Sequence, residues 1–228
     1  MGRIMPVTIA LAIVVVALVA SPLACAYDPD KLQDFCVAIK DSDANVFVNG
    51  KICKNIAEVN ADDFYLQARF NIPRNTSNLF GYVRTPIGAE HLPGLNTMGI
   101  SIGRVDLGPY GVNTPHIHPL ATEVVTVLEG RIYVGFIDSR NRLYAKTLLP
   151  GDIFVLPKGL VHFLYNTGER NAVVYAAFGS QNPEALHLPN TIFDSDPPVP
   201  LEILSKAFLL DKTVISRIRS QIRSGFSE

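Results

Sequence analysis

Four side chains in the second half of the sequence have the chemistry of metal ligands. His116 and His118 stand one residue apart, and Glu123 follows them just ahead of a run of β-branched residues. Successive side chains of a β-strand point to opposite faces, so the two histidines share one face. Pro119 cannot continue an ordinary strand ladder, and a bend at this proline resets the alternation. The spacing therefore allows all three side chains to converge.

His162 is the fourth candidate ligand. Its neighbours Val161, Phe163 and Tyr165 occupy the opposite face of an expected strand. A polar ring in such a strand needs a partner. A lone histidine in this setting is more often hydrogen-bonded within a core than bound to a metal, because buried polar groups usually find hydrogen-bond partners. Three histidines and one carboxylate on adjoining strands instead predict a metal centre. The remaining histidines, His91 and His187, stand in loop-like, proline-flanked contexts, and we expect both at the surface.

The elements that must position these side chains are short strands. From Leu95 onward the pattern is that of a β-barrel or a β-sandwich, with short runs rich in Val, Ile, Tyr and Phe separated by turn-forming Gly, Pro, Asp and Asn. The expected strands are Val124–Leu128, Ile132–Ile137, Leu143–Leu149, Ile153–Leu156, Val161–Tyr165 and Ala172–Phe178. Because the turns are short and no helical segment intervenes, neighbouring strands should be antiparallel, as in a β-barrel or a β-sandwich.

The period of the apolar residues changes after the proline-rich stretch 196–200. From there the spacing predicts two helices, Leu201–Leu209 and Thr213–Arg223. Their apolar faces must pack on the outside of the barrel or on a neighbouring subunit. No internal repeat is present, and we expect one domain.

The N-terminus is typical of a secretory signal. An apolar run, Ile4–Ala20, follows Arg3, and Ala24-Cys25-Ala26 provides a small-residue cleavage site. We therefore expect residues 1–26 to be removed, leaving 27–228 as a single domain with a barrel at about 60–180 and helices at about 200–224. The alternative is an uncleaved membrane anchor, since a span needs roughly 20 apolar residues. The 20 basic and 21 acidic side chains nearly balance, which argues against a nucleic-acid-binding surface.

Two further features agree with an extracellular protein. Cys25 would leave with the signal, so Cys36 and Cys53 remain as an even pair, and a disulfide is expected in an oxidising compartment. Two buried free thiols are the alternative. Asn75-Thr76-Ser77 is an N-glycosylation sequon in a polar stretch, so Asn75 is a candidate glycosylation site.

Longer stretches around the candidate ligands resemble a known family. Gly111–Gly130 resembles the first signature box of the cupin superfamily, and Gly151–Asn166 resembles the second. The resemblance extends over the mature chain to the plant germin-like proteins. The supporting stretches are Leu32–Ala38, Pro93–Thr97, Phe178–Pro183 and Asp194–Pro198.

The resemblance implies an all-β jelly-roll barrel, a single germin-type cupin domain, with C-terminal α-helices. It also implies a manganese ion held by His116, His118, Glu123 and His162, and a Cys36–Cys53 bridge. Secretion to the apoplast and a homohexamer built as a trimer of dimers complete the expectation. Imidazole and carboxylate ligands without thiolate independently argue against a soft structural zinc cluster, and four ligands on a six-coordinate ion leave two positions open.

The sequence departs from the family pattern at two places. Tyr110 stands where the first box usually has a glycine, which concerns the shape of the loop. Family members with oxalate oxidase activity resemble one another in two asparagines that reach the substrate. Asn113 matches one of these and is a candidate substrate contact, but Gly103 occupies the other position.

Three functions remain open from the sequence. The first is a manganese-dependent superoxide dismutase of the cell wall that produces hydrogen peroxide in plant defence. The second is an oxalate oxidase, which Gly103 disfavours. The third is a non-catalytic extracellular binding, receptor-like or structural cell-wall protein. All three need the same metal ligands, and the enzymes take a small anionic substrate.

Overall fold

The computed structural model describes residues 35–39 and 50–225. The expected signal sequence 1–26, and the membrane anchor considered as its alternative, lie outside these residues. Within the described part of the chain, no helix combines the length and apolar character needed to cross a membrane.

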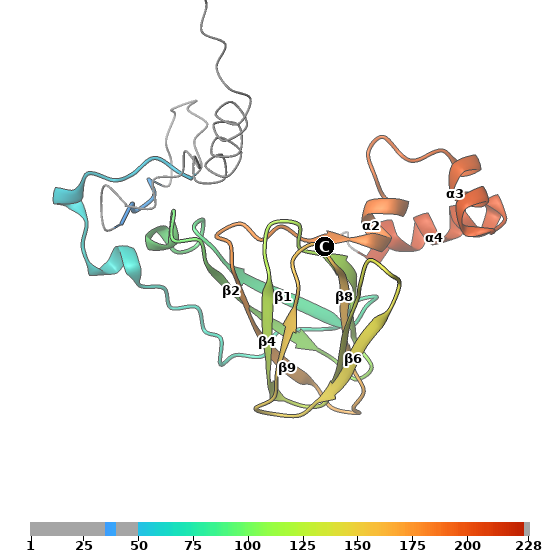
Figure 1. Ribbon diagram of the computed structural model, residues 1–228, viewed down its shortest axis with the longest axis horizontal. Helices are drawn as coiled ribbons and strands as arrows, with labels where there is room; N and C mark the ends of the chain where they lie inside the picture. Colours follow the sequence, from blue (N-terminus) through green and yellow to red (C-terminus); the bar gives the residue numbers. More distant parts are fainter. Residues whose placement is uncertain (1–34, 40–49, 226–228) are drawn as a thin grey trace, which may run out of the picture. The chain divides into compact units, whose positions relative to one another are not determined.

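Two antiparallel five-stranded sheets form the body of the domain (Figure 1). The first sheet has the order β1-β2-β9-β4-β7, and the second has the order β10-β3-β8-β5-β6. The strands of the first sheet are β1 Tyr82–Ile87, β2 Ser101–Leu107, β9 Ala172–Phe178, β4 Glu123–Glu129 and β7 Ile153–Leu156. Those of the second are β10 Leu186–His187, β3 Val112–Ile117, β8 Val161–Asn166, β5 Ile132–Ile137 and β6 Leu143–Leu148. This arrangement confirms the predicted jelly-roll class, and the six predicted strands are β4 to β9 with ends that differ by at most one residue.

The core lies between the inner faces of the two sheets. In β4, alternate residues are buried: Val125 and Val127 are buried and Val124 is exposed. The same alternation in β8 buries His162 and Leu164. Burial of such apolar side chains contributes roughly 1.5–3 kcal/mol each. Some polar side chains near the strand ends also face inward and are buried. The candidate ligands are among them.

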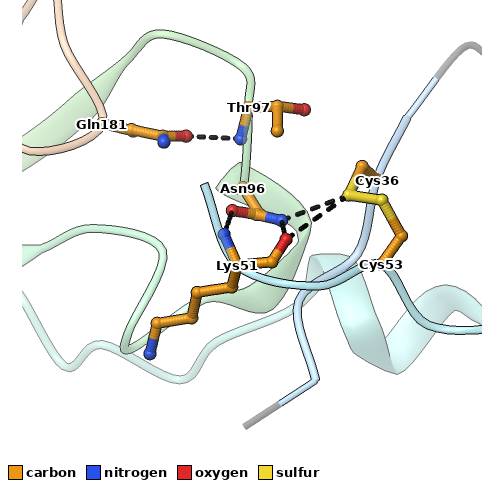
Figure 2. The surroundings of a disulfide bond; sticks show 6 residues. All are labelled: Cys36, Lys51, Cys53, Asn96, Thr97 and Gln181. Carbon is orange, nitrogen blue, oxygen red and sulfur yellow. Dashed lines mark hydrogen bonds between the residues drawn. A yellow bond between two sulfur atoms is a disulfide. The ribbon is translucent and has the colours of Figure 1, made fainter. Parts of the chain in front are cut away.

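The segment before β1 contains two short 3-10 helices, η2 Ile56–Glu58 and η3 Ala61–Phe64, and a third, η4 Pro93–Leu95, precedes β2. Cys36 and Cys53 are joined by a disulfide. Figure 2 shows the buried Asn96 beside this bridge, with its amide bonded to the backbone of Lys51 at 2.9 and 2.8 Å and to the Cys36 sulfur at 3.2 Å. The next residue, Thr97, donates its backbone N–H to the side chain of Gln181. These contacts tie the N-terminal segment to the loops that follow η4 and β9.

Three helices follow β10: α2 Leu188–Phe193, α3 Leu201–Phe208 and α4 Lys212–Gly225. The last two confirm the predicted C-terminal helices, while α2 was not expected, because its Leu-Pro-Asn-Thr-Ile-Phe sequence is too short to show a helical period. α2 packs beside β3, and α3 and α4 pack against one another away from the sheets (Figure 1). Leu204, Ile215 and Ile222 are buried in this packing, but the remaining apolar residues are not.

Candidate metal centre

The four candidate ligands meet at one end of the space between the sheets. His116 on β3 and His162 on β8 are directly paired in the register of the second sheet. His118 follows the end of β3, and Glu123 is the first residue of β4 in the first sheet. One ligand atom from each residue can be chosen so that all lie within 4.8 Å of one another. The carboxylate oxygen Oε2 of Glu123 lies 3.2 Å from Nε2 of His162 and 3.4 Å from Nε2 of His118.

The backbone fixes the tautomer of all three histidines. Nδ1 of His116 lies 2.8 Å from the carbonyl oxygen of Thr114, and Nδ1 of His162 lies 2.8 Å from that of Leu160. Nδ1 of His118 meets the carbonyl oxygen of Glu184. A carbonyl oxygen only accepts hydrogen bonds, so each Nδ1 must carry the proton. Each Nε2 is then unprotonated, which is the state in which imidazole binds a metal.

Burial favours the neutral form of two of these rings, those of His116 and His118. It lowers the pKa of His116 well below its usual value, with the nearby His162 adding to the effect. Burial also lowers the pKa of His118, although the Glu123 carboxylate opposes this shift. Metal binding competes with protonation, so a low imidazole pKa favours it.

Two buried ligand atoms have no hydrogen-bond partner within the described residues, Oε2 of Glu123 and Nε2 of His162. Leaving such an atom unsatisfied costs roughly 1–3 kcal/mol, and more for a charged group. A divalent cation between the two atoms would satisfy both. The donor set of three neutral imidazoles and one carboxylate, without thiolate, therefore fits a transition-metal ion of the manganese, iron or zinc type.

His187 lies next to this centre, and the prediction that it is a surface residue was wrong. It pairs with His116 between β10 and β3, and the two rings stack with 4.8 Å between centroids. Its Nδ1 lies 3.0 Å from the Thr114 hydroxyl. Burial, followed by the charge of Arg84, lowers the pKa of His187 to about 4. The loop context of the sequence gave no sign of the β10 pairing that buries the ring, whereas His91 is exposed as expected.

The sequence profile of the cupin family matches residues 68–216. The chain is 46% identical to germin-like protein subfamily 1 member 20 of Arabidopsis thaliana over 213 residues, which is 92% of this chain and 95% of that protein. It is 49% identical to germin-like protein 8-2 of Oryza sativa subsp. japonica, covering 89% of this chain and 92% of the relative. The chain belongs to the germin-like proteins of the cupin family. A solved structure of a recombinant oxalate oxidase in complex with glycolate superposes with a TM-score of 0.81 and 41% identity, over 87% of this chain and 100% of that one.

In this germin-like protein a cavity of about 970 Å³ opens beside the ligands. His116, His118 and Glu123 line it, together with Asn113 and Gly103. Asn113 is 2% exposed, and its Oδ1 has no partner among the residues described. The structure thus places the candidate substrate contact and three of the four candidate ligands at one cavity.

A Cβ atom could be added at Gly103 without a clash. A Cβ atom built there would lie 3.6 Å from Cε2 of Phe178 and 3.7 Å from the carbonyl oxygen of Thr85, which are ordinary contact distances. A side chain at this position would begin in contact with the Phe178 ring and the backbone of β1.

The sequence reasoning missed Arg84 as a residue of this cavity. It lies on β1, a strand that was not predicted. The six residues of β1 include Arg84 and Pro86, which break up its short apolar pattern. Alternation with Tyr82 was the signal that could have placed Arg84 on the inner face.

Proposed function

We propose that this germin-like protein is a secreted manganese protein of the plant cell wall that converts superoxide into hydrogen peroxide and dioxygen, and that the peroxide serves defence. The observation that carries the proposal is the buried set of three neutral imidazoles and one carboxylate, with two partnerless ligand atoms, at the wall of an open cavity. His116, His118, Glu123 and His162 would hold the ion.

Manganese supplies a one-electron couple between its divalent and trivalent states, which lets one superoxide lose an electron and a second gain one. The second superoxide takes up two protons to become hydrogen peroxide, and the open cavity admits these protons from solvent. The ligands and a divalent ion together carry one net positive charge, which attracts a small anion. The backbone carbonyls at each Nδ1 hold the rings in place and raise the basicity of Nε2, which tunes the redox potential.

Three features support secretion. The N-terminal pattern is typical of a cleaved signal. The Cys36–Cys53 disulfide requires an oxidising compartment. Asn75 is exposed at the surface, as attachment of a glycan demands.

We also propose that the chain assembles into a homohexamer through its C-terminal helices. Four apolar residues at the end of α3 or on its outer face remain exposed in the single chain: Ile203, Phe208, Leu209 and Leu210. Exposed apolar residues grouped in this way favour burial against another subunit.

Oxalate oxidation is the second candidate, favoured by the likeness to the solved oxalate oxidase and by Asn113 in the cavity. Gly103 weighs against it, because one of the two expected amide donors is absent. A non-catalytic binding protein would use the same ligands and would differ only in lacking turnover.

The test uses the glycosylated protein purified from a plant or yeast host. Metal per subunit, superoxide dismutation and oxalate oxidation are measured on the wild type, on His162→Ala, and on His91→Ala as a control that removes an exposed histidine. We expect about one manganese per subunit and superoxide turnover in the wild type and the control, and loss of both in His162→Ala. Full metal content in His162→Ala would contradict the ligand set. Full metal content in the wild type without superoxide turnover would favour the binding protein.

A further inference from the structure

One of the three ligand histidines is oriented by a loop that lies far away in the sequence. Nδ1 of His116 and Nδ1 of His162 each meet the carbonyl oxygen of the residue two positions earlier, at 2.8 Å. Nδ1 of His118 instead meets the carbonyl oxygen of Glu184, 66 residues further along the chain. Local backbone therefore orients two of the rings, whereas the third depends on where this loop is held.

The single proton of the neutral His118 ring has a second possible acceptor. Oε2 of Glu123 lies 3.4 Å from Nε2 of the ring. A neutral imidazole carries its proton either on Nδ1 or on Nε2. With the proton on Nδ1, the ring bonds the Glu184 carbonyl and Nε2 can bind a metal. With the proton on Nε2, the ring bonds Glu123 and this ligand nitrogen is blocked. The position of the Glu184 carbonyl thus decides whether His118 is ready to bind an ion.

The backbone at Glu184 is held in place by its surroundings. Its φ is 51°, in the left-handed region that residues other than glycine rarely adopt. The Glu184 side chain is exposed, and its carboxylate accepts a hydrogen bond of 2.9 Å from Asn182 within the same loop, 179–185. This local bond does not fix the loop against the rest of the domain. The carbonyl of Glu184 is therefore positioned by contacts made elsewhere in the loop.

Contacts to the rest of the domain are made on both sides of Glu184. Gly179 donates its backbone N–H to the carbonyl oxygen of Thr122 at 3.0 Å, and beyond Glu184 the chain enters β10, which pairs with β3. Between these points, Oε1 of Gln181 accepts a hydrogen bond from the backbone N–H of Thr97. In the part of the chain that the structure describes, no other side chain of this loop hydrogen-bonds outside it. Gln181 is thus the side chain that ties the loop down.

Thr97 is a fixed point of attachment. It follows Asn96, which is fully buried and whose side chain bonds the backbone N–H and carbonyl of Lys51 at 2.9 and 2.8 Å. Figure 2 shows the Gln181 amide directed at the backbone nitrogen of Thr97. Gln181 stands three residues before Glu184. The bond to Thr97 therefore restrains the chain close to the carbonyl that orients the ring.

We propose that Gln181 is a positioning residue of the metal centre. By bonding to Thr97 it keeps the Glu184 carbonyl at Nδ1 of His118, and so keeps Nε2 of His118 available to an ion. The proposal rests on the proposed function in one respect, that His118 binds a metal. Gln181 itself contacts neither the ion nor a substrate in this role. Because only the Nδ1–H form of His118 can bind, the apparent metal affinity falls in proportion to the fraction of that form.

The direct readout is the tautomer of His118 in metal-free protein. Protein isotopically labelled at the histidine ring nitrogens is measured by magic-angle-spinning NMR at about pH 8, where neutral imidazole dominates. The signals of His118 are assigned by their loss in His118→Gln. We expect the Nδ1–H form in the wild type. In Gln181→Met, which keeps the length of the side chain and removes its acceptor oxygen, we expect most of His118 to carry the proton on Nε2.

Manganese affinity is the second readout, with free Mn²⁺ measured by electron paramagnetic resonance. We expect the dissociation constant of Gln181→Met to rise about 10-fold, the lower end of the range for losing a contact that orients a ligand. Gln181→Glu keeps an acceptor oxygen for the Thr97 N–H and should retain the wild-type tautomer. The matched control is Asn182→Ala, which removes the neighbouring amide, whose bond to Glu184 is exposed and internal to the loop. It should match the wild type in both readouts.

Four results would overturn the proposal. The first is an unchanged tautomer of His118 in Gln181→Met. The second is an equal change at His116 and His162, which would indicate a general disturbance of the site. The third is the same change in Gln181→Glu or Asn182→Ala. The fourth is a changed tautomer with unchanged manganese affinity. A wild type that binds no manganese would count against the proposed function alone, because the metal-free spectra still decide whether Gln181 positions the ring.

Discussion

Replacing Gly103 by asparagine should raise the oxalate oxidase activity of this protein. The residue lies on the inner face of β2 in the cavity, across which Asn113 supplies the other amide. A Cβ atom at this position meets nothing closer than 3.6 Å, so a side chain can start here without a clash at Cβ. The added amide would stand where the family resemblance expects the second donor to oxalate.

The size of the effect follows from one hydrogen bond. A hydrogen bond to a charged group contributes roughly 1.5–3 kcal/mol, and each 1.4 kcal/mol changes a rate about tenfold. We therefore expect kcat/KM for oxalate to rise about 10- to 100-fold in Gly103→Asn. Superoxide is smaller and needs no such donor, so its turnover should stay the same.

The assay measures hydrogen peroxide formed from oxalate, with metal content determined on the same samples. Gly103→Ala is the matched control, because it adds the Cβ without the amide. An unchanged oxalate rate in Gly103→Asn at full metal content would refute the reasoning, as would an equal gain in Gly103→Ala. Strong oxalate oxidation by the wild type would show that Asn113 suffices or that another residue replaces the missing amide.

Three further predictions concern stability. Because the pKa of His187 is about 4 in the folded protein and about 6.5 in the unfolded chain, the stability that its neutral ring contributes is complete above pH 6.5. This stability is lost between about pH 6.5 and 4, by up to ~3 kcal/mol. Urea unfolding of metal-free protein should show that the free energy of unfolding falls less with acid in His187→Phe than in the wild type. An equal fall in both proteins would contradict this. A Cβ at Gly111 would lie 2.1 Å from the Gly81 carbonyl oxygen, so thermal unfolding should show Gly111→Ala destabilised by more than ~2 kcal/mol, and a melting temperature equal to the wild type would count against this. Replacing Cys36 and Cys53 together by serine should remove about 3 kcal/mol of stability and leave the metal content intact; an unchanged urea midpoint would speak against that.

The strands and the candidate ligands could be read from the sequence because both depend on local pattern. Alternating apolar residues between turn signals are sufficient to place a strand in a two-sheet fold, since one face must be buried. His116 and His118 share a face by alternation alone. Predicting the position of Glu123 required one further assumption, a bend at Pro119. The structure places Glu123 beside His118 as expected.

The errors fall where contacts are made by residues far apart in sequence. His187 has no local pattern, and the two-residue strand β10 exists only because β3 lies next to it. α2 is similarly short, and its position beside β3 stabilises it. Nothing in the sequence distinguishes Arg84 from other basic residues. The pairing of β1 with β2 places it, with Gly103, in the lining of the cavity.

By itself, the sequence determined an antiparallel barrel or sandwich, the four candidate ligands and the pair of cysteines, because alternation, turn chemistry and ligand type are properties of short segments. The jelly-roll class followed from the resemblance to the cupin family. The tertiary structure decided which atoms face one another. Backbone carbonyls determine which nitrogen of each ligand histidine is protonated. Oε2 of Glu123 and Nε2 of His162 have no hydrogen-bond partner within the described residues. Arg84, Asn113 and Gly103, from three different strands, line one cavity. These are distances between separate strands, and they arise only when burial of both sheets' inner faces brings those strands together.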